Sequence, residues 1–297
     1  MVHLNPKPID INKTMGQFNI LFIGYGKMGA CLGGLITNGH SALGLKVKTY
    51  KFTSSINELA DVDLKTVKFN LVCIFTKPQN TLAAFASLAK ATKGNIASCF
   101  NKDTVFMSIL AGKDYDFIKQ ALLAINYNPQ DSFKYARLMP NLGLLGGRGF
   151  VSAFFKDLPQ QAKDNLLACF KNHGRVFEVD TEDKIDPLTA VFGCGSGFAA
   201  FVANAFNTAA EHFLQSQDIK GLDKSDFTNI FTSVFSLALQ DKSFNLETFA
   251  NNVASKGGAT EAGYNAMLNC GGCDDIEDVF AKTFGAALNR AKELKVN

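Results

Sequence analysis

Three glycines near the start of the chain have the spacing of a phosphate-binding loop. Gly24, Gly26 and Gly29 form a Gly-x-Gly-x-x-Gly pattern that directly follows an apolar run at residues 18–24 and opens a helical pattern at residues 27–38. In this context the first glycine permits a tight turn, the second lets backbone approach a pyrophosphate, and the third lets the helix pack on the strand. The helix N-terminus then faces the anion. The pattern therefore predicts a dinucleotide site, whose ligands in this loop are Gly24, Tyr25, Gly26, Lys27 and Met28.

The end of the second expected strand indicates which dinucleotide binds. A site for NAD usually has Asp or Glu about 20 residues past the glycines, where the carboxylate binds the ribose 2′-hydroxyl. Residues 49–55 read Thr-Tyr-Lys-Phe-Thr-Ser-Ser and contain no acid. Lys51 and the nearby hydroxyls would attract a 2′-phosphate, so we expect NADPH, with NADH as the alternative. The alternative interpretation is that Lys51 is a surface lysine with no role in cofactor binding.

A second glycine-rich loop lies near the other end of the chain. Gly257 and Gly258 precede Ala259 and Thr260, where a helical pattern begins. Free backbone N–H groups at a helix N-terminus bind a carboxylate without a positive side chain. We therefore expect substrate contacts from Gly257, Gly258, Ala259 and Thr260. A helix N-cap role alone would explain the residue type of Thr260 equally well.

Composition argues against several other functions. Only four of the thirty basic residues are Arg, the lysines are dispersed and the net charge is +3, so we expect no nucleic-acid partner. The polar first 17 residues lack a secretory signal, and we expect a cytoplasmic protein with no membrane-spanning segment. The seven cysteines are typical of reduced thiols. Cys270 and Cys273 lack the second ligand pair of a zinc site, so we expect no metal.

The elements that would position these residues divide the chain in two. After a disordered tail at residues 1–17, alternating strand and helix patterns predict a doubly wound Rossmann domain over residues 18–180. The expected strands are residues 18–24, 45–50, 70–75, 104–109, 135–139, 150–155 and 175–179. The expected helices are residues 27–38, 57–62 (weakly), 81–91, 114–124 and 159–172, the first ended by Asn38-Gly39.

The sequence pattern of residues 181–297 predicts an all-helical domain. The expected helices are residues 187–217, 223–240, 246–253, 260–268 and 274–294. The first is apolar nearly all round, and such a helix must be buried on every side. We therefore expect a homodimer through this domain. Gly193, Gly195 and Gly197 interrupt the helix, at a cost of roughly 1 kcal/mol each, which indicates close packing or a nearby ligand.

Several short blocks together resemble the pyrroline-5-carboxylate reductase family, from about Phe18 to Leu294. The order Lys-Pro-Gln, Arg-Leu-Met-Pro-Asn and Gly-Gly-Ala-Thr is more specific than the glycine loop. The blocks are Phe-Ile-Gly-Tyr-Gly-Lys-Met (22–28), Thr-Lys-Pro-Gln (76–79), Ser-Ile-Leu-Ala-Gly (108–112), Arg-Leu-Met-Pro-Asn (137–141), Asp-Pro-Leu-Thr (186–189) and Asn-Val-Ala-Ser-Lys-Gly-Gly-Ala-Thr (252–260).

The resemblance implies NAD(P)H-dependent reduction of a cyclic imine, 1-pyrroline-5-carboxylate, to L-proline, and a dimer that often assembles further. Thr260 would be the catalytic residue, since its hydroxyl would contact the ring nitrogen while hydride reaches the neighbouring carbon. Further cofactor-binding residues would be Thr76, Lys77 and Pro78 beside the nicotinamide, Leu110, Ala111 and Gly112 through their backbone, and Asn252.

Some positions depart from the family pattern, and they keep other functions open. The family usually has proline or small polar residues where this chain has Leu142, Gly143, Phe192, Ser196 and Lys256. The alternatives are a reductase of another cyclic imine and a non-catalytic paralogue that binds a nicotinamide cofactor. Reduction of a hydroxy- or keto-acid is disfavoured, because residues 187–217 lack the lysine that many such enzymes use as general acid.

Overall fold

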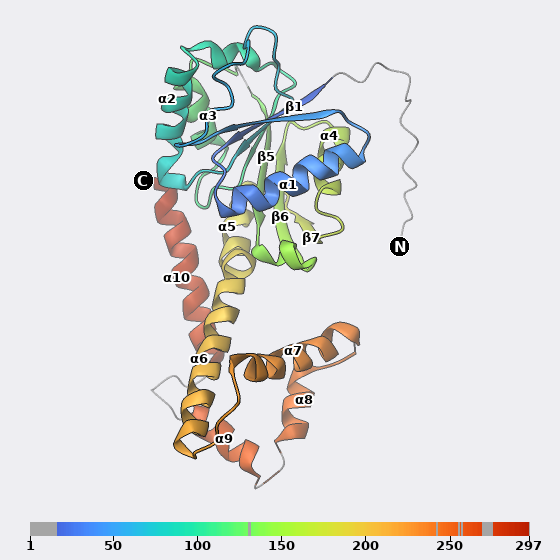
Figure 1. The fold of residues 1–297 in the computed structure, drawn as a ribbon, viewed down its shortest axis with the longest axis vertical. Helices are drawn as coiled ribbons and strands as arrows, with labels where there is room; N and C mark the ends of the chain where they lie inside the picture. The colour runs from blue at the N-terminus through green and yellow to red at the C-terminus, as the bar shows by residue number, and fades with distance from the viewer. Residues whose placement is uncertain are drawn as a thin grey trace. The chain divides into compact units, whose positions relative to one another are not determined.

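The computed structural model describes residues 17–129, 132–241, 243–254, 256, 258–268 and 276–296 (Figure 1). The expected disordered tail thus lies outside the described residues, apart from Gln17. The chain divides into two compact units. One comprises Met1–Gly193 with Leu288–Asn297, and the other Cys194–Ala287. The expected domain boundary at residue 180 stays a prediction.

A seven-stranded sheet forms the centre of the first unit. Its strand order is β2-β1-β3-β4-β5-β6-β7. The strands are β1 (Phe18–Ile23), β2 (Val47–Phe52), β3 (Leu71–Ile74), β4 (Val105–Ser108), β5 (Lys134–Pro140), β6 (Gly149–Lys156) and β7 (Gly174–Glu178). Neighbouring strands are parallel except for β5 and β6. The expected α/β Rossmann fold is confirmed.

The antiparallel pair β5–β6 departs from the parallel sheet that alternating strands and helices usually form. Only the short 3₁₀ helix η3 (Leu142–Gly146) connects the two strands. A parallel neighbour requires a crossover of a dozen or more residues, usually through a helix, whereas a short connection returns the chain antiparallel. Asn141 stabilises this connection, since its Oδ1 accepts hydrogen bonds from the backbone N–H groups of Gly143 and Phe150, both at 3.1 Å.

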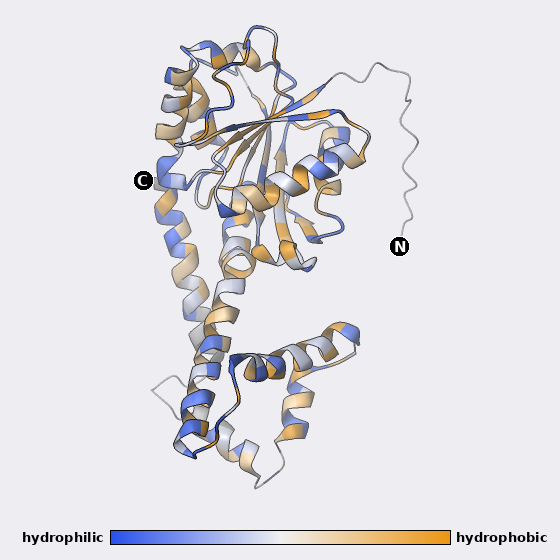
Figure 2. Cartoon of the chain, viewed as in Figure 1, coloured by the Kyte–Doolittle hydropathy of each residue, from blue (hydrophilic) through white to orange (hydrophobic). Residues whose placement is uncertain are grey.

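Helices cover both faces of the sheet because the strand residues alternate between two apolar cores. In β1, Leu21 and Ile23 belong to the core beneath α2 (Thr81–Ala91) and α3 (Tyr115–Leu123). Ile20 and Phe22 belong to the core beneath α1 (Lys27–Ala42) and α4 (Gln160–Ala168). The central strands are mostly apolar, with β3 reading Leu-Val-Cys-Ile, whereas α1 and α4 carry both polar and apolar residues (Figure 2). Burying each large apolar side chain contributes roughly 1.5–3 kcal/mol.

Two local expectations in this unit are wrong. α1 does not end at Asn38-Gly39 but continues to Ala42. A Cβ on Gly39 would lie 2.6 Å from the Cys169 sulfur, so this glycine serves close packing of the helix and is not its C-cap. Residues 57–62 do not form a helix either, because Asn57 pairs with Phe52 in an antiparallel bridge and turns follow.

Beyond β7, the described residues form helices and their connections, in agreement with the expected all-α region. Short 3₁₀ helices η1 (Pro78–Asn80) and η2 (Asn95–Cys99) lie in the first unit, and η4 (Glu182–Lys184) precedes the longer helices. Those helices are α5 (Ile185–Leu188), α6 (Cys194–Ser216), α7 (Lys224–Gln240), α8 (Leu246–Val253), α9 (Ala259–Leu268) and α10 (Ile276–Val296). A π-helical turn, η5 (Thr189–Gly193), joins α5 to α6, at the start of the glycine cluster. The expected uniform helix over residues 187–217 therefore changes its winding there.

The helical stretch Glu182–Ser216 is long and apolar enough to cross a membrane by length and composition. Residues 187–210 contain no Asp, Glu, Lys or Arg, so the expectation that no run approaches membrane-spanning length is wrong. Of its most apolar window, 11% is buried within the single chain, and Phe201 is 75% exposed. Large exposed apolar surfaces of this kind mark sites of contact with another protein or with a membrane.

Candidate functional site

The glycine loop lies where the order of the strands reverses. β1 pairs with β2 on one side and with β3 on the other, so the crevice beyond their carboxyl ends is the usual ligand position in an open α/β sheet. Gly24 follows β1 with φ +84°, a conformation that favours glycine. A Cβ on Gly24 would lie 2.8 Å from the Thr76 nitrogen. A Cβ on Gly29 would lie 3.2 Å from the ring of Phe75. Both glycines therefore hold the loop close to the end of β3.

Gly26 has a different role from its two neighbours. It is the N-cap residue of α1, its φ of −74° suits any residue, and no side chain caps the helix there. A Cβ on Gly26 would meet nothing within 4 Å. The fold therefore does not require glycine at this position, whereas an anion bound against the N–H groups of the first turn would.

A cavity of about 580 Å³ opens beside Gly26. Its walls come from the glycine loop, the segment after β2, the end of β3 and one face of α2. The lining residues are Gly24, Tyr25, Gly26, Phe52, Thr53, Ser54, Ser55, Ile56, Phe75, Thr76, Lys77, Asn80, Ala83, Ala84 and Ser87. Among the expected cofactor ligands, Gly24, Tyr25, Gly26, Thr76 and Lys77 are brought together here. Lys27, Met28, Lys51, Pro78, Leu110, Ala111, Gly112 and Asn252 lie outside this lining.

The segment after β3 is fixed by short polar contacts. The hydroxyls of Thr76 and Thr81 lie 2.7 Å apart, and the Thr81 hydroxyl also donates to the Lys77 carbonyl at 3.2 Å. Pro78 is the first residue of η1, where its missing N–H costs nothing. These contacts hold Thr76 and Lys77 at the edge of the cavity.

An acid that the sequence pattern did not reveal lies at the end of β2. Residues 53–58 turn back along the strand, and the Glu58 Oε2 accepts a hydrogen bond from the Lys51 backbone N–H at 2.8 Å. The Lys51 ammonium lies 3.9 Å from the Glu58 Oε1 and 4.8 Å from the centre of the Tyr25 ring. Lys51 thus reaches the glycine loop, but with a carboxylate beside it. Only the bridge between Phe52 and Asn57 brings Glu58 there, and the spacing used for NAD sites does not anticipate it.

The loop after β4 is held by the last residues of the chain. Gly112 has φ +67°, and a Cβ on it would lie 2.1 Å from the Ala291 carbonyl oxygen of α10. The Lys295 ammonium contacts the Asp114 Oδ2 at 2.8 Å. Burial alone would raise the pKa of Asp114, but hydrogen bonds from Lys295 and the Phe117 N–H hold that pKa below its usual value. Gly112 therefore owes its residue type to helix packing as well as to its backbone conformation.

A buried ion network supports the same loop from its other side. Arg137 is 2% exposed, and its Nη2 donates to the Asp186 Oδ1 at 2.6 Å and to the Leu110 carbonyl at 3.4 Å. Glu182 lies 3.8 Å from the guanidinium and accepts hydrogen bonds from the Tyr115 N–H. Burial raises the pKa of Glu182, and both the hydrogen bond from the Tyr115 N–H and the charge of Arg137 act to lower it. The Arg-Leu-Met-Pro-Asn block thus contacts the Asp-Pro-Leu-Thr block through the ion pair between Arg137 and Asp186. The sequence did not reveal this structural role of the two blocks.

The departures from the family pattern are explained in part. The Phe192 ring stacks on Phe150 with ring centres 3.8 Å apart, and the Phe192 carbonyl accepts a hydrogen bond from the Asn141 Nδ2 at 2.9 Å. Phe192 therefore has a packing role. Leu142 is 50% exposed, Lys256 is also exposed, and nothing in the structure explains the residue at Ser196.

The expected substrate loop belongs to the second unit. Asn252 is exposed near the end of α8. Ala259 is the first residue of α9 and Thr260 the second. A capping residue precedes the first helical residue, so the N-cap interpretation of Thr260 does not fit. Gly258 lies at the start of the helix, where its carbonyl accepts a hydrogen bond from the Ala262 N–H at 3.2 Å. Gly257 lies outside the described residues.

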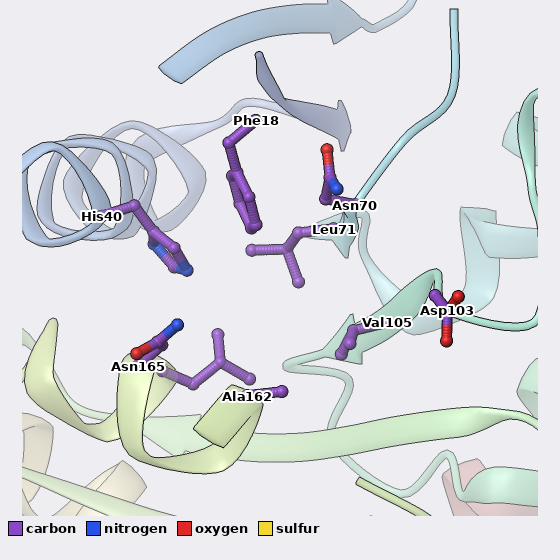
Figure 3. A pocket seen from close by; sticks show the side chains of 9 residues that line it. Phe18, His40, Asn70, Leu71, Asp103, Val105, Ala162 and Asn165 are labelled. Atoms are coloured by element: carbon purple, nitrogen blue, oxygen red, sulfur yellow. The ribbon is translucent and has the colours of Figure 1, made fainter. Parts of the chain in front are cut away.

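A smaller cavity, of about 120 Å³, lies at the opposite ends of the strands (Figure 3). Phe18, Leu71 and Val105 line it near the beginnings of β1, β3 and β4. Its polar groups already have protein partners. His40 Nδ1 lies 2.8 Å from the Ile36 carbonyl, and the Asp103 carboxylate binds Lys134 at 2.6 Å. This cavity is a gap in packing between α1 and α4.

The described residues contain no cluster of three or more His, Cys, Asp or Glu side chains that could hold a metal. Cys270 and Cys273 lie outside them. Burial raises the pKa of Cys73 well above its usual value and that of Cys169 to about 12. These thiols therefore behave as small apolar groups.

Comparisons with known proteins give matches to one family in sequence and in fold. A family model described as pyrroline-5-carboxylate reductase dimerisation matches residues 182–294. The pyrroline-5-carboxylate reductase of Staphylococcus aureus (strain COL) is 29% identical over 227 residues, which cover 75% of this chain and 74% of that protein. The Staphylococcus saprophyticus enzyme is 28% identical over 263 residues, covering 87% and 86%. Both relatives and the matched model belong to the pyrroline-5-carboxylate reductase family, to which this chain is similar over most of its length. The resemblance drawn from the sequence blocks is thereby confirmed.

Solved structures share the fold. The pyrroline carboxylate reductase of Plasmodium falciparum superposes with a TM-score of 0.69 at 16% identity, covering 94% of this chain and 98% of that one. The Streptococcus pyogenes enzyme gives 0.69 at 17% identity, covering 93% and 99%. The matched dimerisation region includes the exposed apolar helix α6, which supports a homodimer.

Proposed function

We propose that this protein reduces 1-pyrroline-5-carboxylate to L-proline, the last step of proline synthesis, with NADPH as the hydride donor. One observation carries the proposal: the glycine loop opens, at the switch point of the sheet, into a cavity large enough for a dinucleotide, in a chain similar to this family. The relatives it matches are named for this activity.

The cavity fits a nicotinamide dinucleotide. The bare N-terminus of α1 and the free space beside Gly26 suit the pyrophosphate. Thr53, Ser54 and Ser55 line the cavity at the end of β2, where hydroxyls suit the 2′-phosphate of NADPH. Lys51 adds a positive charge close by, which favours NADPH over NADH. The Plasmodium falciparum structure contains bound NADP.

The chain's own residues would position the two reactants. Thr76, Lys77 and Pro78 would flank the nicotinamide, the backbone of Leu110, Ala111 and Gly112 would complete that wall, and Asn252 would lie beside the cofactor. The bound cofactor supplies a hydride. The backbone N–H groups at residues 257–260 would hold the substrate carboxylate, and the Thr260 hydroxyl would contact the ring nitrogen. Hydride adds to the carbon of the protonated C=N bond, and the electron pair of that bond moves to nitrogen, so no further proton is required.

The same proposal includes the assembly and the location of the enzyme. The apolar faces of the helical domain at residues 181–297 would meet those of a second copy, and dimers would assemble further. The enzyme would work in the cytoplasm.

The test is direct. Purified protein should oxidise NADPH, followed at 340 nm, when 1-pyrroline-5-carboxylate is added. Thr260→Ala should lower kcat at least several-fold with little change in the KM for NADPH, whereas Thr248→Ala, at an exposed threonine on α8, should leave both constants unchanged. Cofactor binding without turnover of this imine would refute the proposal. Turnover of a different imine only would assign another substrate.

A further inference from the structure

The chain returns to β2 through a compact loop that presents Glu58 to Lys51. The Thr53 hydroxyl accepts hydrogen bonds from the N–H groups of Ser55 and Ile56, and the Thr53 N–H donates to the Ile56 carbonyl at 2.7 Å. The Glu58 N–H then donates to the Lys51 carbonyl at 3.0 Å, while the Glu58 carboxylate accepts from the Lys51 N–H. Two reciprocal contacts therefore fix the Glu58 carboxylate beside the strand.

The Lys51 ammonium is held less tightly than the carboxylate. Its distance of 3.9 Å from the Glu58 Oε1 exceeds that of a direct hydrogen bond, and its other contact is the face of the Tyr25 ring. Tyr25 lines the cavity, as do Thr53, Ser54 and Ser55. The ammonium therefore lies next to the part of the cavity that suits a 2′-phosphate, and it can turn from the carboxylate toward an arriving anion.

We propose that Glu58 sets the cofactor selectivity of this enzyme by competing with the 2′-phosphate of NADPH for the Lys51 ammonium. The inference rests on the proposed use of the cavity for a nicotinamide dinucleotide. Binding of NADPH requires the Lys51 ammonium to leave Glu58 and places the 2′-phosphate near the Glu58 carboxylate, and both effects weaken binding. NADH has no phosphate at this position, so neither effect applies to it. Glu58 thereby reduces the preference for NADPH that Lys51 and the hydroxyls create.

The size of the effect follows from the exposure of the groups. Two unit charges about 4 Å apart in water interact by an amount equivalent to about a five-fold change in binding, and more where water is partly excluded. Glu58→Gln keeps an oxygen to accept from the Lys51 N–H and removes only the charge. We therefore expect it to lower the Kd and KM for NADPH about three- to ten-fold and to leave those for NADH within about two-fold.

Glu58→Gln, Lys51→Met, their double variant and Asp61→Asn together test the assignment, with binding measured by calorimetry for both cofactors and turnover measured in parallel. Lys51→Met should weaken NADPH binding several-fold and abolish the effect of Glu58→Gln in the double variant. Asp61→Asn removes the same charge from an exposed residue of the same segment and should leave the NADPH to NADH ratio unchanged. Raising the salt concentration should shrink the effect of Glu58→Gln.

The outcomes separate this inference from the proposed function. Equal changes for both cofactors, tighter NADPH binding in Asp61→Asn, or no coupling to Lys51 would overturn the role of Glu58 even in an active enzyme. Selective binding changes in a protein that does not turn over 1-pyrroline-5-carboxylate would support the role of Glu58 and refute the proposed reaction. Failure to bind either cofactor would overturn both.

Discussion

Gly26→Ala is expected to separate cofactor binding from folding. Gly24 and Gly29 both face backbone or side-chain atoms at short distance, so substitutions there disturb the fold itself. Gly26 has no such neighbour, since a Cβ there would meet nothing within 4 Å. The new methyl group would nevertheless occupy the wall of the cavity at the N-terminus of α1. Its cost should therefore fall on the bound pyrophosphate.

The two magnitudes differ widely. The extended conformation of Gly26 is open to alanine, and lost chain entropy in the unfolded state offsets the weaker capping by alanine, so we expect a stability change within about 0.5 kcal/mol. Displacing the pyrophosphate would remove at least one hydrogen bond to a charged group, worth about 1.5–3 kcal/mol. That loss corresponds to roughly 10- to 150-fold weaker binding of NADPH.

The assay is a titration of the protein with NADPH, followed by the fluorescence of the reduced nicotinamide. Gly34→Ala is the matched control: it lies in the same helix, also has free space around its Cβ, and is absent from the cavity lining. That variant should gain about 1 kcal/mol of stability and bind NADPH normally. Normal NADPH binding by Gly26→Ala, or equal loss of binding in both variants, would refute the placement of the pyrophosphate.

Two further predictions concern the supports of the loop after β4. Arg137→Met should lower the free energy of unfolding in urea by about 3–5 kcal/mol, because it leaves the buried Asp186 carboxylate without its cation, and a loss under 1 kcal/mol would contradict this. The lowered pKa of Asp114 predicts a contribution to stability that is present above the unfolded-state pKa of about 3.9 and is lost as the pH falls through the lower folded-state pKa. Since the Lys295 side chain is half exposed, Lys295→Met should lower the free energy of unfolding by only about 0.5–1 kcal/mol at neutral pH. It should also flatten the dependence of Tm on pH below pH 4. An unchanged dependence of Tm on pH in that range would contradict the pairing of Lys295 with Asp114.

The sequence predicted the sheet and its glycine loop because those features are local. Continuous apolar runs specify buried parallel strands, and the glycine spacing specifies the turn into α1. The antiparallel β5–β6 pair could also have been predicted, since no helix pattern separates Met139 from Phe150. The winding change at Thr189–Gly193 has no comparable signal, because it depends on how a glycine-rich helix packs.

The parts of the site that escaped prediction depend on contacts between distant residues. Glu58 reaches β2 only because the chain reverses after Phe52, so a search for an acid along the strand itself misses it. Arg137 and Asp186 are 49 residues apart, and neither residue type alone indicates burial. In each case the sequence did not show which opposite charge lies next to the residue. That pairing is determined by the fold and not by a local sequence pattern.

The final residues of the chain complete the first unit. The unit that carries the cavity includes Leu288–Asn297, and Ala291 and Lys295 contact the loop that begins at Leu110. The expected boundary at residue 180, where the alternation of strands and helices ends, assigns these residues to the helical domain. Because Gly112 combines a positive φ with the 2.1 Å approach to the Ala291 carbonyl, a Cβ at this position would require α10 to move. The backbone expected beside the nicotinamide is therefore held in place by the end of the helical region, and a fragment ending at residue 180 would lack the helix that contacts this loop.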